Sequence, residues 1–364
     1  MSNRILRVGI LGQGRSGHDI HLRWLREAPD QYQVVAVADA MPDRWEARET
    51  VGARAFGDYH ALLAEKGLEI DLIVNALPSF LHPSATLEAL TAGYNVVCEK
   101  PQARTVREFD TVVAAAGRHR RHYIPFQNSR FYPYFIKLYE VIASGVLGKI
   151  VFIRSNWSGF GRRWDWQAIQ EFHGGNLLNS GPHPLDHAVM LFGAKVPKVF
   201  ARLACENPFG DADNFAAVTL YGPDAPTIEV VVNSFQVYSQ GEQYNVCGTC
   251  GGLAGGPLGL KWKYFDPAQA PEHVFSGTWS DQRTYCSETL PWIEKTWAPP
   301  ASPLDAFQVI SKGFYDHVYD VMVNGAAPVI THKEVRSQIA VIEEARRQNL
   351  LPAMKKRFLT KGHP

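Results

Sequence analysis

Two short stretches of the 364-residue chain contain residues whose types and spacing suit acid–base chemistry. The first is Glu99-Lys100-Pro101, which directly follows an apolar run. Two charged residues at the end of a buried strand are unsuited to a hydrophobic core but well placed for a ligand-binding or catalytic site. Lys100 could hold a substrate hydroxyl oxygen and stabilise an alkoxide as a hydride leaves the carbon, and Pro101 would fix the backbone where the loop begins. The alternative interpretation is a surface ion pair.

The second stretch covers residues 174–187, where Asn179, His183 and His187 are spaced four apart. If the segment is helical, these three side chains share one face, and we expect all three to contact substrate. The prolines favour a helix that begins at Pro184, with His183 at its start. The helix dipole would then lower the pKa of His183 and keep the ring neutral, fit to accept a proton. The alternatives are a capping histidine, or a metal site that would lack a distant ligand.

A loop that precedes this stretch, residues 160–167, contains two arginines, an aspartate and two tryptophans. Aromatic faces with polar neighbours suit sugar rings, which expose C–H groups on one side and hydroxyls around the rim. We therefore expect Arg163 and Trp164 to contact substrate. The alternative is cation–π stacking within the protein itself.

The elements that must position these residues begin with an apolar run over 8–11 and a G-x-G-x-x-G pattern at Gly12, Gly14 and Gly17. This pattern predicts a buried strand that turns into a helix over 18–27. The first glycine permits a tight turn, the second lets the backbone approach a pyrophosphate, and the third allows close packing of helix and strand. The residues expected to contact the dinucleotide here are Gly12, Gln13, Gly14, Arg15, Ser16 and Gly17.

A second apolar strand over 33–39 ends in Asp39, 22 residues beyond Gly17 (39 − 17). This is close to the spacing of about 20 residues expected for the carboxylate that binds an adenosine ribose diol. An acid there repels a 2′-phosphate, so NAD is favoured over NADP. The neighbouring Arg44 complicates this preference, and Asp39 could instead open a turn before Pro42.

Helices and strands then alternate up to residue 125, which predicts a parallel, doubly wound sheet. We expect helices over 61–66 and 83–92 and strands over 70–76 and 94–98, with a last strand near residue 124. Ligands bind such sheets beyond the carboxyl ends of the strands. Further residues expected at the cofactor are Leu77, Pro78, His82, Glu99, Lys100 and Asn128, and Arg130 is expected at the substrate; hydrogen bonding between domains is the alternative for Asn128 and Arg130.

The pattern changes near residue 126. After a helix over 134–143, period-two alternation predicts strands over 150–157, 199–205, 214–221 and 227–235. Turns separate them, so we expect a large, open, mostly antiparallel sheet. The predicted domains are 1–125 for the dinucleotide and 126–364 for substrate and oligomerisation. A bare apolar sheet face predicts a homodimer or homotetramer.

Composition narrows the setting of the protein. A formal net charge of +1 argues against a dedicated nucleic-acid binder. No apolar run is long enough for a membrane helix, and strand-like sequence near Met1 leaves no room for a signal peptide. Five scattered cysteines favour reduced thiols and a cytoplasmic protein. Cys247 and Cys250 lack a second C-x-x-C pair, so we expect a glycine-rich turn there and no metal.

Together these patterns resemble the Gfo/Idh/MocA family of nicotinamide-dependent oxidoreductases. The resemblance includes the glycine loop with Asp39, Pro78 with His82, Glu99-Lys100-Pro101, Arg130-Phe131 with Pro133, the G-G…G-x-H-x-x-D pattern at 174–186, Gly-Thr-x-Gly at 248–251, and the segment 314–350. It implies a nucleotide-binding domain, an α/β domain with a large sheet, and oxidation or reduction at a hydroxyl carbon of a sugar, cyclitol or polyol.

The family lysine matches Lys100, and the histidine that usually accepts the proton matches His183. The family often has an aspartate where this chain has Asn179, which can bind a hydroxyl but cannot take a proton. We therefore predict an NAD-dependent sugar or polyol dehydrogenase whose proton transfer depends on His183 with Lys100. The alternatives are a redox-neutral enzyme with tightly held NAD (glycoside cleavage, elimination or epimerisation) and a non-catalytic NAD-binding regulator.

Overall fold

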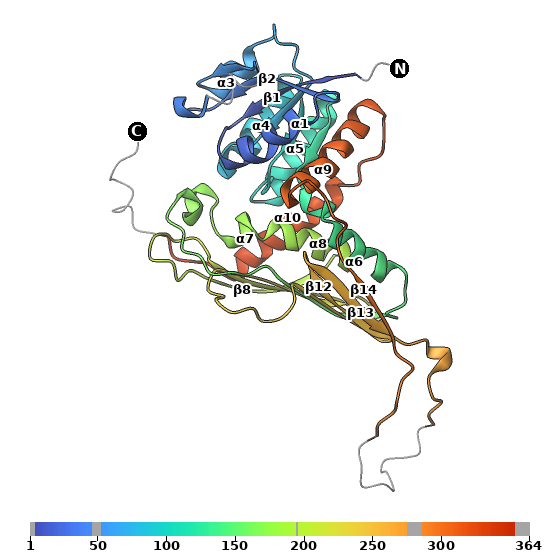
Figure 1. The fold of residues 1–364 in the computed structure, drawn as a ribbon. Helices are drawn as coiled ribbons and strands as arrows, with labels where there is room; N and C mark the ends of the chain where they lie inside the picture. Colours follow the sequence, from blue (N-terminus) through green and yellow to red (C-terminus); the bar gives the residue numbers. More distant parts are fainter. Residues whose placement is uncertain (1–3, 46–51, 194–195, 275–285, 354–364) are drawn as a thin grey trace.

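Two sheets organise the chain, and helices cover both faces of the first and one face of the second (Figure 1). The computed structural model describes residues 4–45, 52–193, 196–274 and 286–353. The first sheet has six strands in the order β3-β2-β1-β4-β5-β6, and all its neighbours are parallel. The order reverses between β1 and β4, which is where ligands bind in doubly wound sheets.

The strands of the first sheet are β1 (Leu6–Leu11), β2 (Tyr32–Ala38), β3 (Arg54–Phe56), β4 (Leu72–Asn75), β5 (Asn95–Cys98) and β6 (Tyr123–Pro125). The helical elements between them are η1 (Ser16–Leu22), α1 (Arg23–Glu27), η2 (Pro42–Trp45), α3 (Tyr59–Ala64), η3 (Ser79–Leu81), α4 (His82–Thr91) and α5 (Val106–His119). Strands β1, β2, β4 and β5 are largely buried, as expected for strands covered on both faces. The predicted parallel doubly wound sheet is confirmed.

The helix after the glycine loop differs in detail from the prediction over 18–27. It begins at Ser16 as the π-helical turn η1 and continues as α1. A π turn holds one more residue than an α turn and is frequent at functional sites. Within η1 the side chain of His21 is fully buried. A sequence pattern with period 3.6 gives no sign of this wider turn.

The second sheet has eight strands in the order β14-β13-β12-β11-β7-β10-β9-β8. Every neighbouring pair is antiparallel except β7 and β10, which confirms a mostly antiparallel sheet. Its strands are β7 (Ile150–Asn156), β8 (Lys198–Ala204), β9 (Phe215–Tyr221), β10 (Thr227–Asn233), β11 (Tyr244–Gly248), β12 (Gly251–Gly256), β13 (Gly259–Tyr264) and β14 (Ile293–Trp297). The last four were not predicted, because glycines and lysines hide their alternation.

Helices cover one face of this sheet: α6 (Pro133–Ala143), α7 (Asn176–Asn179), α8 (Pro182–Phe192) and α10 (His332–Gln348) (Figure 1). Three large apolar side chains on strands β7, β8 and β9 are exposed to solvent: Val151, Phe200 and Tyr221. Cys247 lies in β11 and Cys250 in the turn that leads to β12, and all five cysteines are free. In the described ranges, no helix is long and apolar enough to cross a bilayer, and no three His, Cys, Asp or Glu residues are grouped to hold a metal.

The two C-terminal helices join the two cores. Helix α9 (Ala306–Val323) packs Phe314 and Tyr315 into the core of the first sheet. Helix α10 places Val335 in that same core and Ile342 in the core of the second sheet. The boundary predicted between residues 125 and 126 stays a prediction, and residues from the end of the chain complete the first core.

Candidate active site

The glycine loop at the end of β1 leaves space for a ligand at one position. Gly12 has a φ of +88°, and a Cβ there would lie 2.5 Å from the Ala76 carbonyl oxygen. A Cβ on Gly17 would lie 1.9 Å from the carbonyl oxygen of Gly12. A Cβ on Gly14 would meet only the Arg44 Nη1, at 3.7 Å. The backbone at Gly14 is therefore open to a pyrophosphate, as the spacing predicts.

Asp39 fixes the carboxyl end of β2 beside this loop. Its Oδ2 accepts a hydrogen bond from the Gln13 backbone N–H (2.8 Å), and its Oδ1 accepts one from the Met41 N–H (2.8 Å). The Arg44 guanidinium lies 3.3 Å from the same carboxylate. The Gln13 Oε1 is buried without a hydrogen-bond partner among the described residues. An open loop, a fixed acid and an unused buried acceptor fit a dinucleotide here.

Lys100 leaves the carboxyl end of β5 and reaches the other half of the molecule. Its Nζ donates a hydrogen bond to the backbone carbonyl of Asn179 (2.9 Å). Burial lowers the pKa of Lys100, Glu99 opposes this effect, and the charges of Arg15 and Arg163 lower the pKa further. An ammonium group has three N–H donors, so this hydrogen bond leaves donor capacity for a substrate oxygen.

His183 lies in the first turn of α8, which begins at Pro182, two residues earlier than predicted. Its ring stacks on Trp157 with centroids 6.0 Å apart, and its Nδ1 is buried without a hydrogen-bond partner in the described part of the chain. Burial, followed by the positive charge of Lys100, lowers the pKa of His183 to about 3. The ring is neutral as expected, but burial rather than the helix dipole is the main cause.

A buried chain of hydrogen-bonding groups supports Lys100, and no sequence pattern predicted it. The Lys100 backbone N–H donates to the Glu99 Oε2 (3.0 Å), and the Glu99 Oε1 lies 3.3 Å from the His21 Nε2. The His21 Nδ1 lies 2.7 Å from the Tyr315 hydroxyl. Burial raises the pKa of Glu99, but the hydrogen bond from His21 and the charge of Lys100 lower it to about 2. Glu99 is thus turned into the protein, although we expected it at the cofactor.

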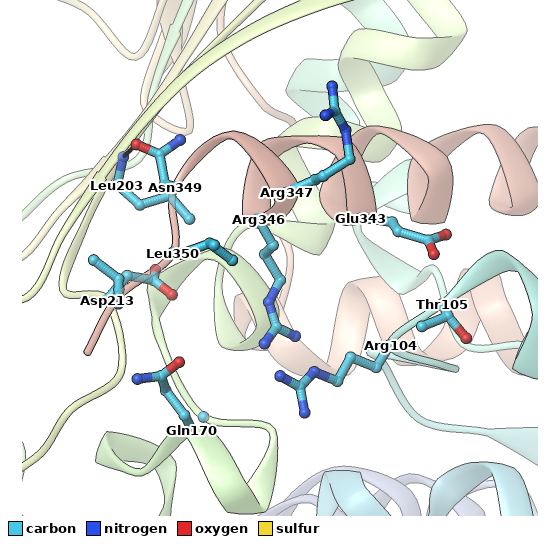
Figure 2. Close-up of a pocket in the computed structure, with 12 residues that line it drawn as sticks. Arg104, Thr105, Gln170, Leu203, Asp213, Glu343, Arg346, Arg347, Asn349 and Leu350 are labelled. Atoms are coloured by element: carbon cyan, nitrogen blue, oxygen red, sulfur yellow. Dashed lines mark hydrogen bonds between the residues drawn. The ribbon is translucent and has the colours of Figure 1, made fainter. Parts of the chain in front are cut away.

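A cavity of about 530 Å³ lies beside Asn179. The loop 161–167 forms one wall, where Arg163 forms an ion pair with Asp165 (3.0 Å) and Trp164 is 77% exposed. Amides and hydroxyls dominate the rest of the lining, which includes Asn176, Asn179, Ser180, Asn207, Asn214 and Ser234. The structure thus brings Arg163, Trp164 and Asn179 together around one polar cavity. A second cavity shares Asp213 with it (Figure 2).

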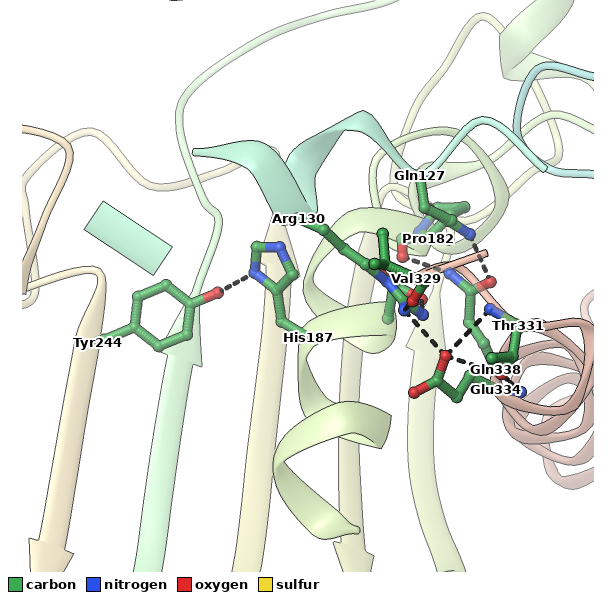
Figure 3. Close-up of polar contacts among 10 residues, drawn as sticks. Gln127, Arg130, Pro182, His187, Tyr244, Val329, Thr331, Glu334 and Gln338 are labelled. Carbon is green, nitrogen blue, oxygen red and sulfur yellow. Dashed lines mark hydrogen bonds and ion pairs between the residues drawn. The ribbon is translucent and has the colours of Figure 1, made fainter. Parts of the chain in front are cut away.

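Arg130 does not face this cavity. Its Nε and Nη2 donate to both oxygens of Asp186 (2.7 Å each), and its Nη1 donates to Glu334 (2.9 Å) and to the Val329 carbonyl (3.0 Å). Figure 3 shows its guanidinium turned toward Glu334. Most of its five N–H donors are occupied. This geometry does not support the expected contact between Arg130 and substrate. Instead, the ion pair with Asp186 holds helix α8 in place.

The side chain of His187 likewise packs inside the protein and does not face the cavity. It is 0% exposed, and its Nδ1 lies 2.7 Å from the Tyr244 hydroxyl (Figure 3). Its ring stacks on Phe135 with centroids 3.5 Å apart. The predicted single face of Asn179, His183 and His187 does not form, because α7 ends at Asn179 and α8 begins only at Pro182.

The remaining expected cofactor residues lie near the same strand ends. His82 is buried between two carbonyl oxygens, those of Pro101 (2.8 Å) and Leu77 (2.7 Å), so it ties the loops after β4 and β5 together. Pro78 directly precedes the short helix η3. The Asn128 Oδ1 is buried and has no partner among the described residues. Arg15 and Ser16 begin η1, and the Arg15 guanidinium lies 5.9 Å from the Phe307 ring centre.

Comparison with known proteins agrees with this arrangement. Residues 6–126 match the family model described as "Oxidoreductase family, NAD-binding Rossmann fold". Residues 135–254 match the model described as "GFO/IDH/MocA C-terminal domain". The two matches fall on the first sheet and on most of the second.

Among curated relatives, an uncharacterized oxidoreductase of Schizosaccharomyces pombe is 25% identical over 87% of this chain and 89% of its own. Trans-1,2-dihydrobenzene-1,2-diol dehydrogenase of Bos taurus is 29% identical (59% and 64%), and inositol 2-dehydrogenase of Salmonella paratyphi B is 29% identical (46% and 48%). The solved structure of the WlbA dehydrogenase from Bordetella pertussis with NADH and UDP-GlcNAcA has a TM-score of 0.73 at 21% identity, covering 95% and 96% of the chains. The chain belongs to the GFO/IDH/MocA family of oxidoreductases and has its NAD-binding Rossmann fold.

Proposed function

We propose that the protein is an NAD-dependent dehydrogenase that acts on a hydroxyl carbon of a sugar, cyclitol or polyol. The observation that carries the proposal is that Lys100, which follows strand β5, donates a hydrogen bond to the backbone carbonyl of Asn179, a residue that lines the polar cavity. The charge of Lys100 also lowers the pKa of His183, so the two side chains lie close enough to interact electrostatically. Relatives named as dehydrogenases of a dihydrodiol and of inositol support the same class of substrate.

In this mechanism His183 accepts the proton of the substrate hydroxyl, and Lys100 donates a hydrogen bond to the resulting alkoxide oxygen. Burial and the positive charge of Lys100 keep His183 unprotonated before substrate binds. During the reaction, the negative charge that develops on the substrate oxygen offsets the charge of Lys100, so His183 can accept the proton. NAD, when bound, supplies the nicotinamide ring that takes the hydride from the substrate carbon. Asn179 holds Lys100 through its carbonyl and lines the cavity with its side chain.

For the cofactor we propose NAD rather than NADP. Asp39 is fixed by two backbone N–H groups at the position of the ribose acid, and its charge repels a 2′-phosphate. Arg44 would favour that phosphate, but its ion pair with Asp39 engages its charge. Gly14 and Asn128 would hold the pyrophosphate and the nicotinamide end, respectively.

We also propose a cytoplasmic homodimer or homotetramer, formed through the second sheet. The exposed Val151, Phe200 and Tyr221 are large apolar side chains on strands of that sheet, and a second copy would cover them. Five free cysteines support a reducing compartment. Size-exclusion chromatography with light scattering measures the state, and Phe200→Asp should shift it toward the monomer.

One observation favours a second candidate, a redox-neutral reaction with tightly held NAD. Asn179 lies where the family often has an aspartate, and an amide cannot exchange a proton with the substrate. Stoichiometry separates the two candidates. A screen of monosaccharides, anhydrosugars, cyclitols and glycosides with added NAD should give NADH in proportion to product. Product formed without NADH would favour the redox-neutral enzyme, and NADP preferred over NAD would contradict the cofactor assignment.

A further inference from the structure

We propose that a second cavity, between the two halves of the molecule, binds a small oxyanion through Arg104 and Arg346. The cavity measures about 350 Å³ and lies between the start of α5, the end of α10 and the segment that leads into α7. Figure 2 shows the guanidinium groups of Arg104 and Arg346 turned toward the same space. The proposal is independent of the dehydrogenase function.

The two arginines lack the partners that such groups normally have. Within the described ranges, neither side chain forms an ion pair or a hydrogen bond, and the Nη1 of Arg346 is buried with no partner at all. Burial, followed by the charge of Arg104, lowers the pKa of Arg346 to about 10. Two like charges that face each other repel, and a buried unpaired donor adds a desolvation cost. An anion between them would remove both penalties.

The carboxylates in the lining hydrogen-bond to helix ends and form no ion pair with these two arginines among the described residues, and the charges of Asp213 and Glu108 offset only part of the effects that lower the pKa of Arg346. The Asp213 Oδ2 accepts from the Leu177 N–H (2.7 Å), and burial raises the pKa of Asp213 to about 6. The Glu343 Oε2 accepts from the Val106 N–H (2.9 Å). Arg347, the third arginine of the lining, forms an ion pair with Glu344 (2.6 Å). Arg104 and Arg346 are therefore the free cations of this cavity, among the residues that the structure describes.

The chemistry of the ligand follows from the two guanidinium groups. Their planar N–H pairs match the oxygens of carboxylate and phosphate groups, which they bind in a bidentate manner. A cavity of this volume suits a small ligand rather than a macromolecule. Inorganic phosphate and a small dicarboxylate share this chemistry, and both are to be tested.

The position of the cavity links it to the candidate active site. Arg104 follows Lys100 by four residues, and Gly174 and Asp213 line the cavity next to the start of α7, which ends at Asn179. An anion held by Arg104 and Arg346 would brace the loop after Lys100 against α10. We expect its binding to stabilise the folded protein, because a ligand that binds only the folded state raises the unfolding temperature.

The test measures thermal unfolding of the full chain in phosphate and in succinate, each against sodium chloride at equal ionic strength. Arg346→Gln and Arg104→Gln are compared with Arg336→Gln, a control on helix α10 whose side chain pairs with Asp110 outside the cavity. We expect a saturable rise of a few degrees in wild type and control, and at least a tenfold weaker midpoint in the other two variants. The response to phosphate or to succinate identifies which oxyanion binds.

Two results would overturn the proposal. Equal responses in all four proteins would place the anion at the glycine loop or on the surface. No response beyond that of chloride would show that the cavity binds neither anion. The chloride data also test the premise: Arg346→Gln should be at least as stable as wild type, because it removes a repulsion. A clear loss of stability would show that Arg346 already has a partner.

Discussion

Two histidines on helix α8 lie one turn apart and have opposite environments. His187 is fully buried, stacks on Phe135 and lies 2.7 Å from the Tyr244 hydroxyl. His183 has a buried Nδ1 without a partner and feels the charge of Lys100. Both were expected to contact substrate. Each ring leaves one buried nitrogen without a hydrogen-bond partner among the described residues, the Nδ1 of His183 and the Nε2 of His187. The comparison therefore teaches that the surroundings of the ring make the difference: Tyr244 and Phe135 hold His187 in place, whereas the charge of Lys100 acts on His183.

The same contrast separates the two buried cations of the region. Arg130 donates to two carboxylates and a backbone carbonyl, whereas Lys100 donates to one carbonyl oxygen. The hydrogen bonds of Arg130 hold α8 to α10 and leave little donor capacity for a ligand. The hydrogen bond of Lys100 leaves N–H groups beside a polar cavity. We therefore expect changes at Lys100 to affect turnover and changes at Arg130 to affect stability.

Of the changes at the two cations, Lys100→Ala should have the larger effect on turnover. Removing a group that stabilises developing negative charge typically lowers kcat by about 10²–10³-fold. NAD binding, measured by titration, should persist because the glycine loop is unchanged. Lys333→Ala, an exposed change on α10, is the control and should leave kcat unaltered. Full activity in Lys100→Ala would contradict the assignment.

Arg130→Gln should act on stability instead. It leaves Asp186 buried without its cation, and breaking such a buried pair costs about 3–5 kcal/mol in the free energy of unfolding. Urea denaturation measures the loss. The double variant Arg130→Met/Asp186→Leu should recover much of it, and Arg154→Gln, which breaks an exposed pair with Glu229, should cost about 1 kcal/mol or less. A stable Arg130→Gln protein that loses turnover would reverse the two roles.

The sequence was sufficient for the buried strands β1, β2, β4 and β5 and for residues that follow them. Apolar runs and glycine spacing placed Lys100, Asp39 and Gly14 at one edge of the sheet, because the carboxyl ends of parallel strands share that edge. Side-chain direction could not be predicted. Glu99 follows the same strand as Lys100 but points inward to His21, and no local pattern encodes a contact between residues 78 positions apart (99 − 21).

The other site predictions failed for two reasons: helix boundaries were misplaced, and some contacts join residues that are far apart in the sequence. Asn179 and His187 were assigned to one face because the spacing of four holds only within a continuous helix, and the break before Pro182 removes it. Tyr315 and Gln338 come from the end of the chain and pack beside residues of its first half. Their partners depend on how α9 and α10 return to the first sheet.

His21→Ala sharpens the comparison, because it removes a partner without touching substrate. Without His21, burial of the Glu99 carboxylate is less well compensated, so we expect the free energy of unfolding to fall by on the order of 2 kcal/mol at pH 7. We also expect about tenfold lower kcat, because Lys100 would be misplaced. In wild type the pKa of Glu99 is lowered to about 2, so its contribution to stability is present above its ordinary pKa and is lost as the pH falls toward 2.

The stability difference between wild type and His21→Ala should therefore narrow as the pH falls below about 4.5. Thermal unfolding between pH 7 and pH 3 measures it. His18→Ala, on the exposed side of the same helix, is the control and should show no such narrowing. A difference that stays constant with pH would mean that His21 acts by packing alone.

The smallest expected effect concerns cofactor choice. Asp39→Asn removes the charge that repels a 2′-phosphate, so the ratio of kcat/KM for NADP to that for NAD should rise about tenfold, or about 1.4 kcal/mol. Arg44→Ala, at the partner in the ion pair, should lower the same ratio. Steady-state rates with both cofactors measure it. An unchanged ratio in Asp39→Asn would show that this carboxylate only holds the glycine loop.

The most direct test of the central claim compares His183→Gln with His187→Gln, using the polyol that the screen identifies. Rates of NADH formation and free energies of unfolding are measured for both proteins. We predict that His183→Gln lowers kcat by about 10²–10⁴-fold with near-normal stability, whereas His187→Gln lowers stability and keeps kcat within a few-fold. Equal loss of kcat in the two variants, or full activity in His183→Gln, would contradict the account.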